Sequence, residues 1–205
     1  QLQALPFPPA LHLKCQAQHF SNSRTVPKFH WYKPHIALLT GIAWDHMNVF
    51  PTFENYLEQF SIFMNGIEPG GVLIFNQNDQ YIVDLVKQHP NLRSIGYHTH
   101  PYLVKNGITW LITPKGEVQI SLFGQHNMQN LQGALLVCRE MGISDDQFYA
   151  AIAHFEGAAN RLEKVLETPH LVYFRDFAHA PSKVKATVEA VRQQFPDKKL
   201  VTCFE

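Results

Sequence analysis

The sequence predicts an α/β protein built on a parallel sheet, with an antiparallel hairpin added to it. Two short runs, residues 35–41 and 70–76, are almost continuously apolar, as are strands that a parallel sheet buries on both faces. Residues 107–113 and 117–123 are two further strand patterns, joined by the tight turn Pro114-Lys-Gly116. This arrangement is typical of a hairpin. The fold class we expect is therefore α/β.

The elements of the N-terminal half follow from local patterns. Residues 1–25 carry three prolines among mixed polar residues and are expected to form an irregular arm, interrupted by a short strand at 11–13. After the first apolar run, Tyr56, Phe60 and Phe63 recur at helical spacing, which predicts a helix. The elements expected in this half are helices at 55–64 and 81–88 and strands at 35–41, 70–76 and 94–97.

The C-terminal half continues the alternation of helices and strands. Ser144 is a typical helix N-cap, and Asp145 and Asp146 would place negative charge in the first turn of the helix that follows. Pro169 marks a break. Besides the hairpin, the elements expected here are helices at 127–141, 144–155 and 182–195 and strands at 170–176 and 199–204.

The last expected elements form a strand–helix–strand unit, which is the beginning of a second parallel sheet. We therefore expect an unplaced arm at 1–26, a partial central domain at 27–168, and the start of a Rossmann-like C-terminal domain at 169–205. Only one crossover is completed before the chain ends at Glu205. The sequence thus predicts a piece of a longer α/β protein.

Composition excludes several classes of protein. The 205 residues are 45% hydrophobic and 17% charged, with zero formal net charge, so the chain can bury a core and carries no basic surface typical of nucleic-acid binding. No apolar run is long enough to span a membrane, and no signal-peptide pattern opens the chain. Cys15, Cys138 and Cys203 lie at scattered spacings. Cys138 falls on an apolar helix face and Cys203 in an apolar strand, which favours buried free thiols in a reducing compartment. We expect a soluble cytoplasmic protein.

One polar turn is the strongest candidate for ligand binding. Asn127 and Asn130 are three residues apart at the start of an expected helix, so both carboxamides project from one side. A carboxamide offers a donor beside an acceptor, and this arrangement can read the N6/N7 edge of adenine. The alternative is a helix cap with a solvated polar turn.

Two histidine-containing motifs could bind a metal. Asp45 and His46 follow the strand at 35–41, where the carboxyl ends of parallel strands line a ligand crevice. Their chemistry alone favours zinc or a hydrogen-bonding role, because magnesium prefers oxygen ligands. His98 and His100 would face the same way on a strand, but no third ligand follows at suitable spacing, which disfavours a metal there.

Two further motifs surround the expected domain boundary. Arg161 comes shortly after Gly157-Ala-Ala and could clamp a phosphate or cap the preceding helix. Asp176 and His179 lie where a strand gives way to a helix, which is again the position of a ligand crevice. An ordinary connection capped by Ser182 is the alternative.

Taken in order, these motifs resemble the Mur ligase family of ATP-dependent, amide-bond-forming enzymes of peptidoglycan synthesis. The resemblance extends over roughly residues 27–205. Lys28-Phe-His-Trp-Tyr-Lys-Pro34 and the Phe-Ala-His-Ala-Pro form of the last motif are most similar to the recycling branch. That branch joins UDP-N-acetylmuramate to L-alanyl-γ-D-glutamyl-meso-diaminopimelate, and the L-alanine-adding ligases stand next to it. The motifs that carry the resemblance are Thr40-Gly-Ile-Ala-Trp-Asp-His-Met47, Gly124-Gln-His-Asn-Met-Gln-Asn130, Gly157-Ala-Ala-Asn-Arg161 and Asp176-Phe-Ala-His-Ala-Pro181.

The resemblance implies a mechanism, two cofactors and a set of contacts. ATP would phosphorylate the muramoyl carboxylate, and the amino group of a peptide or amino acid would then displace phosphate. Magnesium would be the metal. The implied roles are His46 as metal ligand with Asp45 supporting it, His126, Asn127 and Asn130 at the adenine, Arg161 and Asp176 at the phosphate and ribose, and His179 in the interdomain cleft.

The chain departs from the family pattern in one decisive way. The Gly-rich phosphate-binding loop ending in Gly-Lys-Thr belongs upstream, and no such string occurs in the sequence. We therefore expect the longer parent to be the ligase and this chain alone to be inactive. A non-catalytic nucleotide-binding module and an α/β interaction domain without a ligand are the alternatives.

Overall fold

The computed structural model describes residues 28–44 and 49–203, and it divides into two compact units. The first unit runs to His98 and also contains residues 132–143, whereas the second contains residues 99–131 and those from Ser144 onward. Helix α3 (Gln125–Glu140) therefore contributes residues to both units. The first unit has one sheet and the second has two, and each unit has buried apolar clusters of its own.

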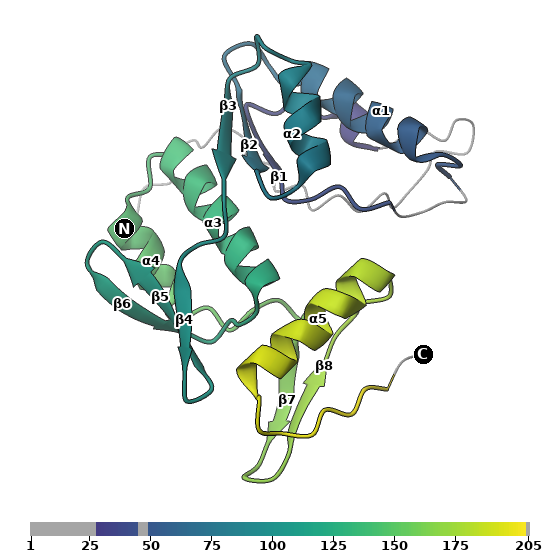
Figure 1. Ribbon diagram of the computed structural model, residues 1–205. Coiled ribbons are helices and arrows are strands. Elements are labelled where there is room, and N and C mark those ends of the chain that lie inside the picture. The colour runs from purple at the N-terminus through teal and green to yellow at the C-terminus, as the bar shows by residue number, and fades with distance from the viewer. Residues whose placement is uncertain (1–27, 45–48, 204–205) are drawn as a thin grey trace. The chain divides into compact units, whose positions relative to one another are not determined.

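The first unit is built on a three-stranded parallel sheet with the strand order β1-β2-β3 (Figure 1). Its strands are β1 (Ile36–Leu39), β2 (Val72–Asn76) and β3 (Ser94–Tyr97). All five residues of β2 are buried, because β2 is the middle strand and both of its faces are covered. The apolar runs at 35–41 and 70–76 are thus confirmed as parallel strands.

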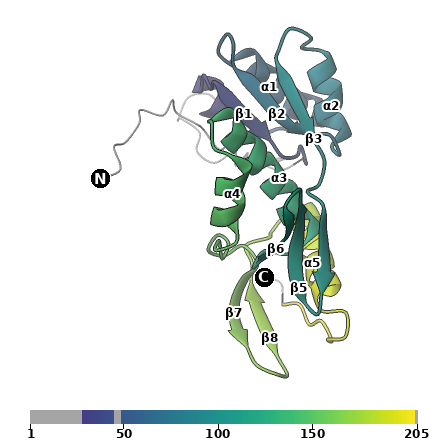
Figure 2. The ribbon, with the colours of Figure 1, turned by 90° about the vertical axis from the view of Figure 1, so that its left-hand side faces the viewer.

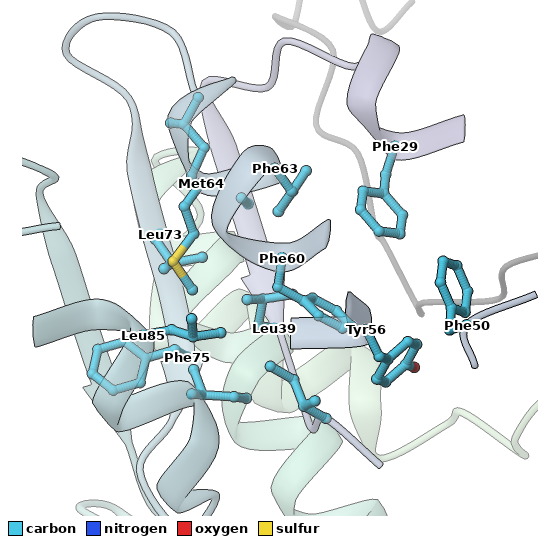
Figure 3. Close-up of a cluster of buried hydrophobic side chains, with 14 residues drawn as sticks. Phe29, Leu39, Phe50, Tyr56, Phe60, Phe63, Met64, Leu73, Phe75 and Leu85 are labelled. Atoms are coloured by element: carbon cyan, nitrogen blue, oxygen red, sulfur yellow. The ribbon is translucent and has the colours of Figure 1, made fainter. Parts of the chain in front are cut away.

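Alternate residues of the sheet enter two different cores. On one face, Leu39, Leu73 and Phe75 pack with side chains of α1 (Phe53–Asn65) and α2 (Gln80–Lys87). Phe29 joins this core from a 3-10 helix, Lys28–Trp31, and its ring lies 5.7 Å from that of Phe60 (Figure 3). On the other face, the core is formed by Leu38, Val72, Ile74 and Tyr97, against which Leu136 and Val137 of α3 pack.

The second unit contains an antiparallel meander of β4 (Tyr102–Lys105), β5 (Ile108–Thr113) and β6 (Gly116–Ile120). The β5–β6 pair confirms the expected hairpin. Strand β4 was not expected, although the Asn106-Gly107 turn that leads to β5 is a readable signal. Both turn residues have positive φ, 51° and 72°, as a type I′ hairpin turn requires.

Two more helices and a second hairpin complete this unit. Helix α4 (Asp145–Ile152) begins with the expected cap, since the Ser144 side chain accepts from the Gln147 amide in a reciprocal capping box. Strands β7 (Glu163–Glu167) and β8 (Val172–Arg175) run antiparallel beside each other (Figure 2), and α5 (Pro181–Gln194) follows them.

The expected strand–helix–strand unit at the C-terminal end is wrong in its pairing. Strand β8 pairs with β7, and residues 199–203 are not in a strand. Thr168 explains the difference, because its amide donates to the Leu171 carbonyl and its hydroxyl accepts from the Leu171 amide. This tight turn lets β8 find a partner at little cost in loop entropy. The boundary expected between the central and C-terminal domains, at 168/169, falls between the paired strands β7 and β8. That boundary stays a prediction.

Two further expectations concern the limits of the description. The short strand expected at 11–13 lies outside the described residues. Within the described part of the chain, no helix is long and apolar enough to cross a membrane. Cys138 and Cys203 are free thiols, but the expected burial is wrong, because Cys138 is half-buried and Cys203 is exposed outside any strand.

Candidate functional site

The start of α3 presents the carboxamide pair. The amides of Asn127 and Met128 donate to the Gly124 carbonyl, which begins the helix. The Asn127 side chain donates through Nδ2 to the Phe123 carbonyl at 2.8 Å. Among the described residues, neither the Asn127 Oδ1 nor the Asn130 carboxamide has a hydrogen-bond partner, and both side chains are half-buried. The pair therefore keeps acceptors and a donor free for a ligand.

Gly124 holds the helix start close to α5. Its φ of 85° lies in the left-handed region, which glycine adopts without steric cost. A Cβ atom at this position would collide with the Cβ of Ala190 and lie 3.2 Å from Cε1 of His126. Gly124 thus permits both the turn and the approach of α5, and it leaves room for the His126 ring in the first turn of α3.

The loop that carries Arg161 has an unusual backbone. Asn160 and Leu162, the two neighbours of Arg161, both have positive φ, 55° and 46°. Asparagine tolerates this conformation, but a leucine there costs about 1–2 kcal/mol. Surrounding contacts hold the strained conformation: the Phe177 amide donates to the Asn160 carbonyl at 3.0 Å, and the Asn160 amide donates to Oε2 of Glu163 at 2.8 Å. That second hydrogen bond, followed by the Arg175 guanidinium, lowers the pKa of Glu163.

Arg161 presents an unpaired cation at this loop. Its guanidinium carbon lies 5.6 Å from the centre of the Phe177 ring, which is 54% exposed. His179 packs edge-on to the same ring at 5.1 Å, and its Nδ1 donates to the Phe177 carbonyl. The guanidinium forms no hydrogen bond or ion pair with any described residue. Its five donors are available to an anion, which an arginine binds in a bidentate manner.

Asp176 links the Arg161 loop to α5. Its Oδ1 accepts from the Leu162 amide at 3.2 Å, and its Oδ2 accepts from the Thr187 hydroxyl at 2.6 Å. Both carboxylate oxygens are thus occupied within the protein, although each can accept a second hydrogen bond. In the structure Asp176 is first of all a bridge between two segments.

A single apolar cluster supports all these segments. Phe123 precedes α3, Leu162 follows Arg161, and Ala190 belongs to α5, and the three are buried together. Phe174, Val191 and Phe195 pack against them, with 5.3 Å between the Phe123 and Phe174 rings. The cluster fixes where each segment leaves the core. The candidates Asn127, Arg161 and Asp176 therefore belong to one unit.

The candidate metal ligands do not gather in the described structure. Asp45 and His46 lie outside the described residues. The described ranges contain no group of three or more histidine, cysteine or acidic side chains that could hold a metal. His98 bonds to Oδ1 of Asn78, and His100 bonds to the Tyr149 hydroxyl. The expectation that both histidines lie on one strand is wrong, because β3 ends at Tyr97. His98 is exposed and His100 is buried.

The residues before Asp45 are held by Asn76 of β2 and by Asp79, the N-cap of α2. Oδ2 of Asp79 accepts from the Ile42 amide at 2.6 Å, and Nδ2 of Asn76 donates to the Thr40 carbonyl at 3.1 Å. Sequence reasoning did not find these roles for Asp79 and Asn76. The only sequence signal here was the turn-prone run Asn76-Gln-Asn-Asp79. It predicts a turn and gives no indication of contacts with Thr40 or Ile42.

Comparison with known proteins identifies the family. The model of the Mur ligase middle domain matches residues 17–138, which is more than half of the chain. The chain belongs to the Mur ligase family. The match begins inside the arm at 1–26 that remained unplaced from the sequence. A UDP-N-acetylmuramate–L-alanine ligase of Phocaeicola vulgatus is 27% identical over 203 residues, which are 95% of this chain and 43% of the relative. The chain thus spans less than half the length of this relative.

Solved structures show the same fold. MurF of Acinetobacter baumannii has a TM-score of 0.68 at 21% identity, covering 80% of this chain and 39% of that one. MurF of Thermotoga maritima, solved in complex with ADP, has a TM-score of 0.63 at 18% identity over 78% and 40% of the two chains. A murein peptide ligase of Psychrobacter arcticus has a TM-score of 0.58 at 19% identity over 84% and 38%. The resemblance seen in the sequence motifs is thereby confirmed at the level of the family and its fold.

Proposed function

We propose that this chain is the nucleotide-binding part of an ATP-dependent ligase of peptidoglycan synthesis. The observation that carries the proposal is the set of free polar groups in the second unit. The carboxamides of Asn127 and Asn130 and the guanidinium of Arg161 lack partners among the described residues. In a chain of the Mur ligase family, an adenine edge fits the carboxamides and a phosphate fits the guanidinium.

The remaining expected roles fit around these groups. We place His126 beside the adenine position, because it lies in the first turn of α3, next to Asn127, and a Cβ added at Gly124 would lie 3.2 Å from its ring. Asp176 can accept from a ribose hydroxyl in addition to its two internal hydrogen bonds. His179 packs edge-on to Phe177 and is exposed, so we place it in the cleft of the longer protein.

The proposed reaction has two steps. A carboxylate oxygen of UDP-N-acetylmuramate attacks the γ-phosphorus of ATP, and ADP leaves, which gives an acyl phosphate. The acceptor's amino nitrogen then attacks the acyl carbon, loses a proton and expels phosphate. Arg161 would neutralise part of the charge that moves in the first step. We assign a magnesium ion to His46, which would hold it with support from Asp45; when bound, the ion would supply further neutralisation of phosphate charge. An ATP-dependent reaction of this kind also agrees with the cytoplasmic location expected from the sequence.

The acceptor of the longer protein is proposed to be a peptide. The lead-in Lys28-Phe-His-Trp-Tyr-Lys-Pro34 and the motif Asp176-Phe-Ala-His-Ala-Pro181 support the tripeptide branch, and a murein peptide ligase is among the similar structures. The first relatives are instead named L-alanine ligases. The test is to express the longer protein encoded by the extended reading frame and to measure its ligation rate with the tripeptide and with L-alanine. The faster acceptor decides between the two assignments. Faster turnover with L-alanine would reject the peptide assignment.

The chain by itself is proposed to bind nucleotide without turnover, because it contains no Gly-Lys-Thr loop. Phosphate release from ATP in the presence of UDP-N-acetylmuramate, acceptor and magnesium measures this. Sustained release by the 205-residue chain would contradict the proposal. A non-catalytic module is the second candidate, favoured by the same missing loop. That candidate predicts no ligation even when the flanking sequence is present.

Calorimetric titration with ATP and adenosine tests the binding site. Asn130→Ala should weaken both ligands about tenfold, the loss expected for one to two hydrogen bonds. Arg161→Ala should weaken ATP and leave adenosine unchanged. Gln125→Ala is the matched control, because Gln125 is a polar carboxamide residue of the same helix and is exposed. If the wild-type chain binds neither ligand and neither raises its melting temperature, an interaction domain without a nucleotide becomes the better description.

A further inference from the structure

Thr187 takes part in the site although no expected role includes it. Its hydroxyl donates to Oδ2 of Asp176 at 2.6 Å, while Oδ1 of the same carboxylate accepts from the Leu162 amide at 3.2 Å. A threonine within a helix commonly bonds to the carbonyl one turn earlier. Here the Thr187 hydroxyl donates instead to the carboxylate of Asp176, which lies outside α5. The three groups form a continuous link from α5 to the Arg161 loop.

The link ends at the most strained residue of that loop. Leu162 has a φ of 46°, which a leucine adopts only when its surroundings impose it. Two contacts do so. The Leu162 side chain is buried in the cluster with Phe123 and Ala190, and its amide is held by Asp176. Loss of the second contact would free the backbone to return to an ordinary conformation.

The conformation of Leu162 decides where Arg161 points. Asn160 and Leu162, on either side of Arg161, are both left-handed, and the guanidinium lies over the Phe177 ring at 5.6 Å. A change of φ at Leu162 would rotate the chain next to Arg161 and move its side chain off that ring. The direction of the Arg161 guanidinium thus depends on the hydroxyl of Thr187 in α5.

We propose that Thr187 is a positioning residue that directs the Arg161 guanidinium toward an anionic ligand, acting through Asp176 and Leu162. The identity of the anion as the phosphate of ATP rests on the proposed function. The link between Thr187 and the direction of Arg161 does not rest on it, and it can be tested without any ligand.

The ligand-free test compares Thr187→Val, which removes the hydroxyl at nearly the same volume, with Thr187→Ser, which keeps it. In Thr187→Val, amide hydrogen exchange at Leu162 should be about tenfold faster, as expected when one hydrogen bond to a carboxylate is weakened. The ring-current shift that Phe177 imposes on the Arg161 side-chain resonances should disappear. Thr187→Ser should restore both signals. The amide of Leu111, paired with Val118 in β5–β6, is the internal control.

Three results would overturn the link. An unchanged Leu162 amide in Thr187→Val would show that the hydroxyl does not hold it. Equal acceleration at Leu162 and Leu111 would show that Thr187 contributes only to the general stability of the unit. Retention of the ring-current shift would show that Arg161 keeps its direction without Thr187. If Thr187→Val fails to fold, Asp176→Asn is read by the same signals, with faster exchange expected at Leu162.

A second test, with ligands, determines whether the direction of the Arg161 guanidinium matters for binding the phosphates of ATP. Thr187→Val should weaken ATP about tenfold and adenosine clearly less, because the phosphate end of the ligand depends on the guanidinium, whereas adenosine is affected only through the ribose contact of Asp176. Equal weakening of both ligands would overturn the phosphate assignment. If the wild type binds neither, the proposed nucleotide function fails, whereas the exchange and ring-current results still decide the role of Thr187.

Discussion

At the residue scale, the hydroxyl of Tyr97 is a polar group left alone in an apolar core. It is buried without a hydrogen-bond partner among the described residues, and burial raises the pKa of this phenol. The ring packs where Gly133 of α3 passes, since a Cβ at Gly133 would lie 3.0 Å from the hydroxyl oxygen. An unpaired buried hydroxyl opposes folding.

The first prediction follows from this cost. Tyr97→Phe keeps the ring and removes the unpaired group, so the free energy of unfolding should stay equal or rise by about 1 kcal/mol. Urea denaturation measures the change. Tyr102→Phe is the control, because the Tyr102 hydroxyl donates to Gln193 at 3.2 Å, and its removal should give no gain. A loss above about 1 kcal/mol in Tyr97→Phe would mean that the hydroxyl has a partner after all.

A second prediction concerns the two tasks of the Asp79 carboxylate. Oδ1 caps α2 by accepting from the Tyr81 and Ile82 amides, while Oδ2 accepts from the Ile42 amide. Asp79→Ala should lower the free energy of unfolding by about 2 kcal/mol, the sum of a lost cap and a lost hydrogen bond. Asp79→Ser keeps a cap but is too short to reach Ile42. Urea denaturation should therefore show a loss of unfolding free energy about half as large for Asp79→Ser as for Asp79→Ala. An equal loss in both variants would mean that the hydrogen bond to Ile42 contributes nothing to stability.

At the element scale, α3 is fastened to β3 by an ion pair. Arg93, just before β3, donates to both carboxylate oxygens of Glu140 at 2.7 and 2.8 Å. This bidentate contact lowers the pKa of Glu140 below its ordinary value of 4.5. A carboxyl whose pKa is lowered by folding stabilises the protein above the unfolded pKa and loses that contribution as the pH falls through the folded pKa.

The third prediction is the pH dependence of this pair. Arg93→Gln should be slightly less stable than the wild type at pH 7, a small effect because the guanidinium is largely exposed. The difference should shrink as the pH falls below 4.5 and vanish once Glu140 is protonated in both states. Thermal melts between pH 3 and 7 at low salt record it. In a Glu140→Gln background, Arg93→Gln should make a difference in stability that does not depend on pH. If the difference between the wild type and Arg93→Gln is instead constant from pH 3 to 7, the ion pair is not its source.

Elements differed in how well the sequence predicted them. Strands β1 and β2 were predictable because their residues are buried on both faces, which requires unbroken apolar runs. The capping box at Ser144 was equally local. Strand β7 was not found, because its residues Glu163, Lys164 and Glu167 are charged and every residue of the strand except Glu163 is exposed on a two-stranded sheet. Its pairing with β8 depends on a turn at Thr168 whose hydroxyl contacts leave no distinct pattern in the sequence.

The candidate site shows the same limit at longer range. Asn127, Asn130 and Arg161 could be proposed from ordered motifs, since their residue types state their chemistry. The contribution of Thr187 could not, because its partner Asp176 lies on another element and is found only after folding. The left-handed backbone at Leu162 was also unpredictable, because leucine carries no preference for it. Sequence patterns report residue types, whereas tertiary contacts decide which groups remain free.

At the scale of the whole chain, the nucleotide candidates fall in one unit. Asn127, Asn130, Arg161 and Asp176 all belong to the second unit, whereas the parallel sheet β1-β2-β3 belongs to the first. A ligand that binds only the folded state stabilises it by RT ln(1 + [L]/Kd). That stabilisation applies to whatever part of the chain must be folded for the ligand to bind.

The fourth prediction uses this difference between the units. ATP at 100 times its dissociation constant should slow hydrogen exchange in β5, β6 and α5 by up to about a hundredfold, where exchange requires the second unit to open. Amides of β1 and β2 should slow much less, because their opening does not remove the proposed contacts. Asn130→Ala, measured at the same ATP concentration, should lose most of the protection. Equal protection of both sheets would instead mean that the units open together, since α3 contributes residues to each of them. Protection confined to β1 and β2 would place the nucleotide in the first unit and reject the assignment of Asn127, Asn130 and Arg161.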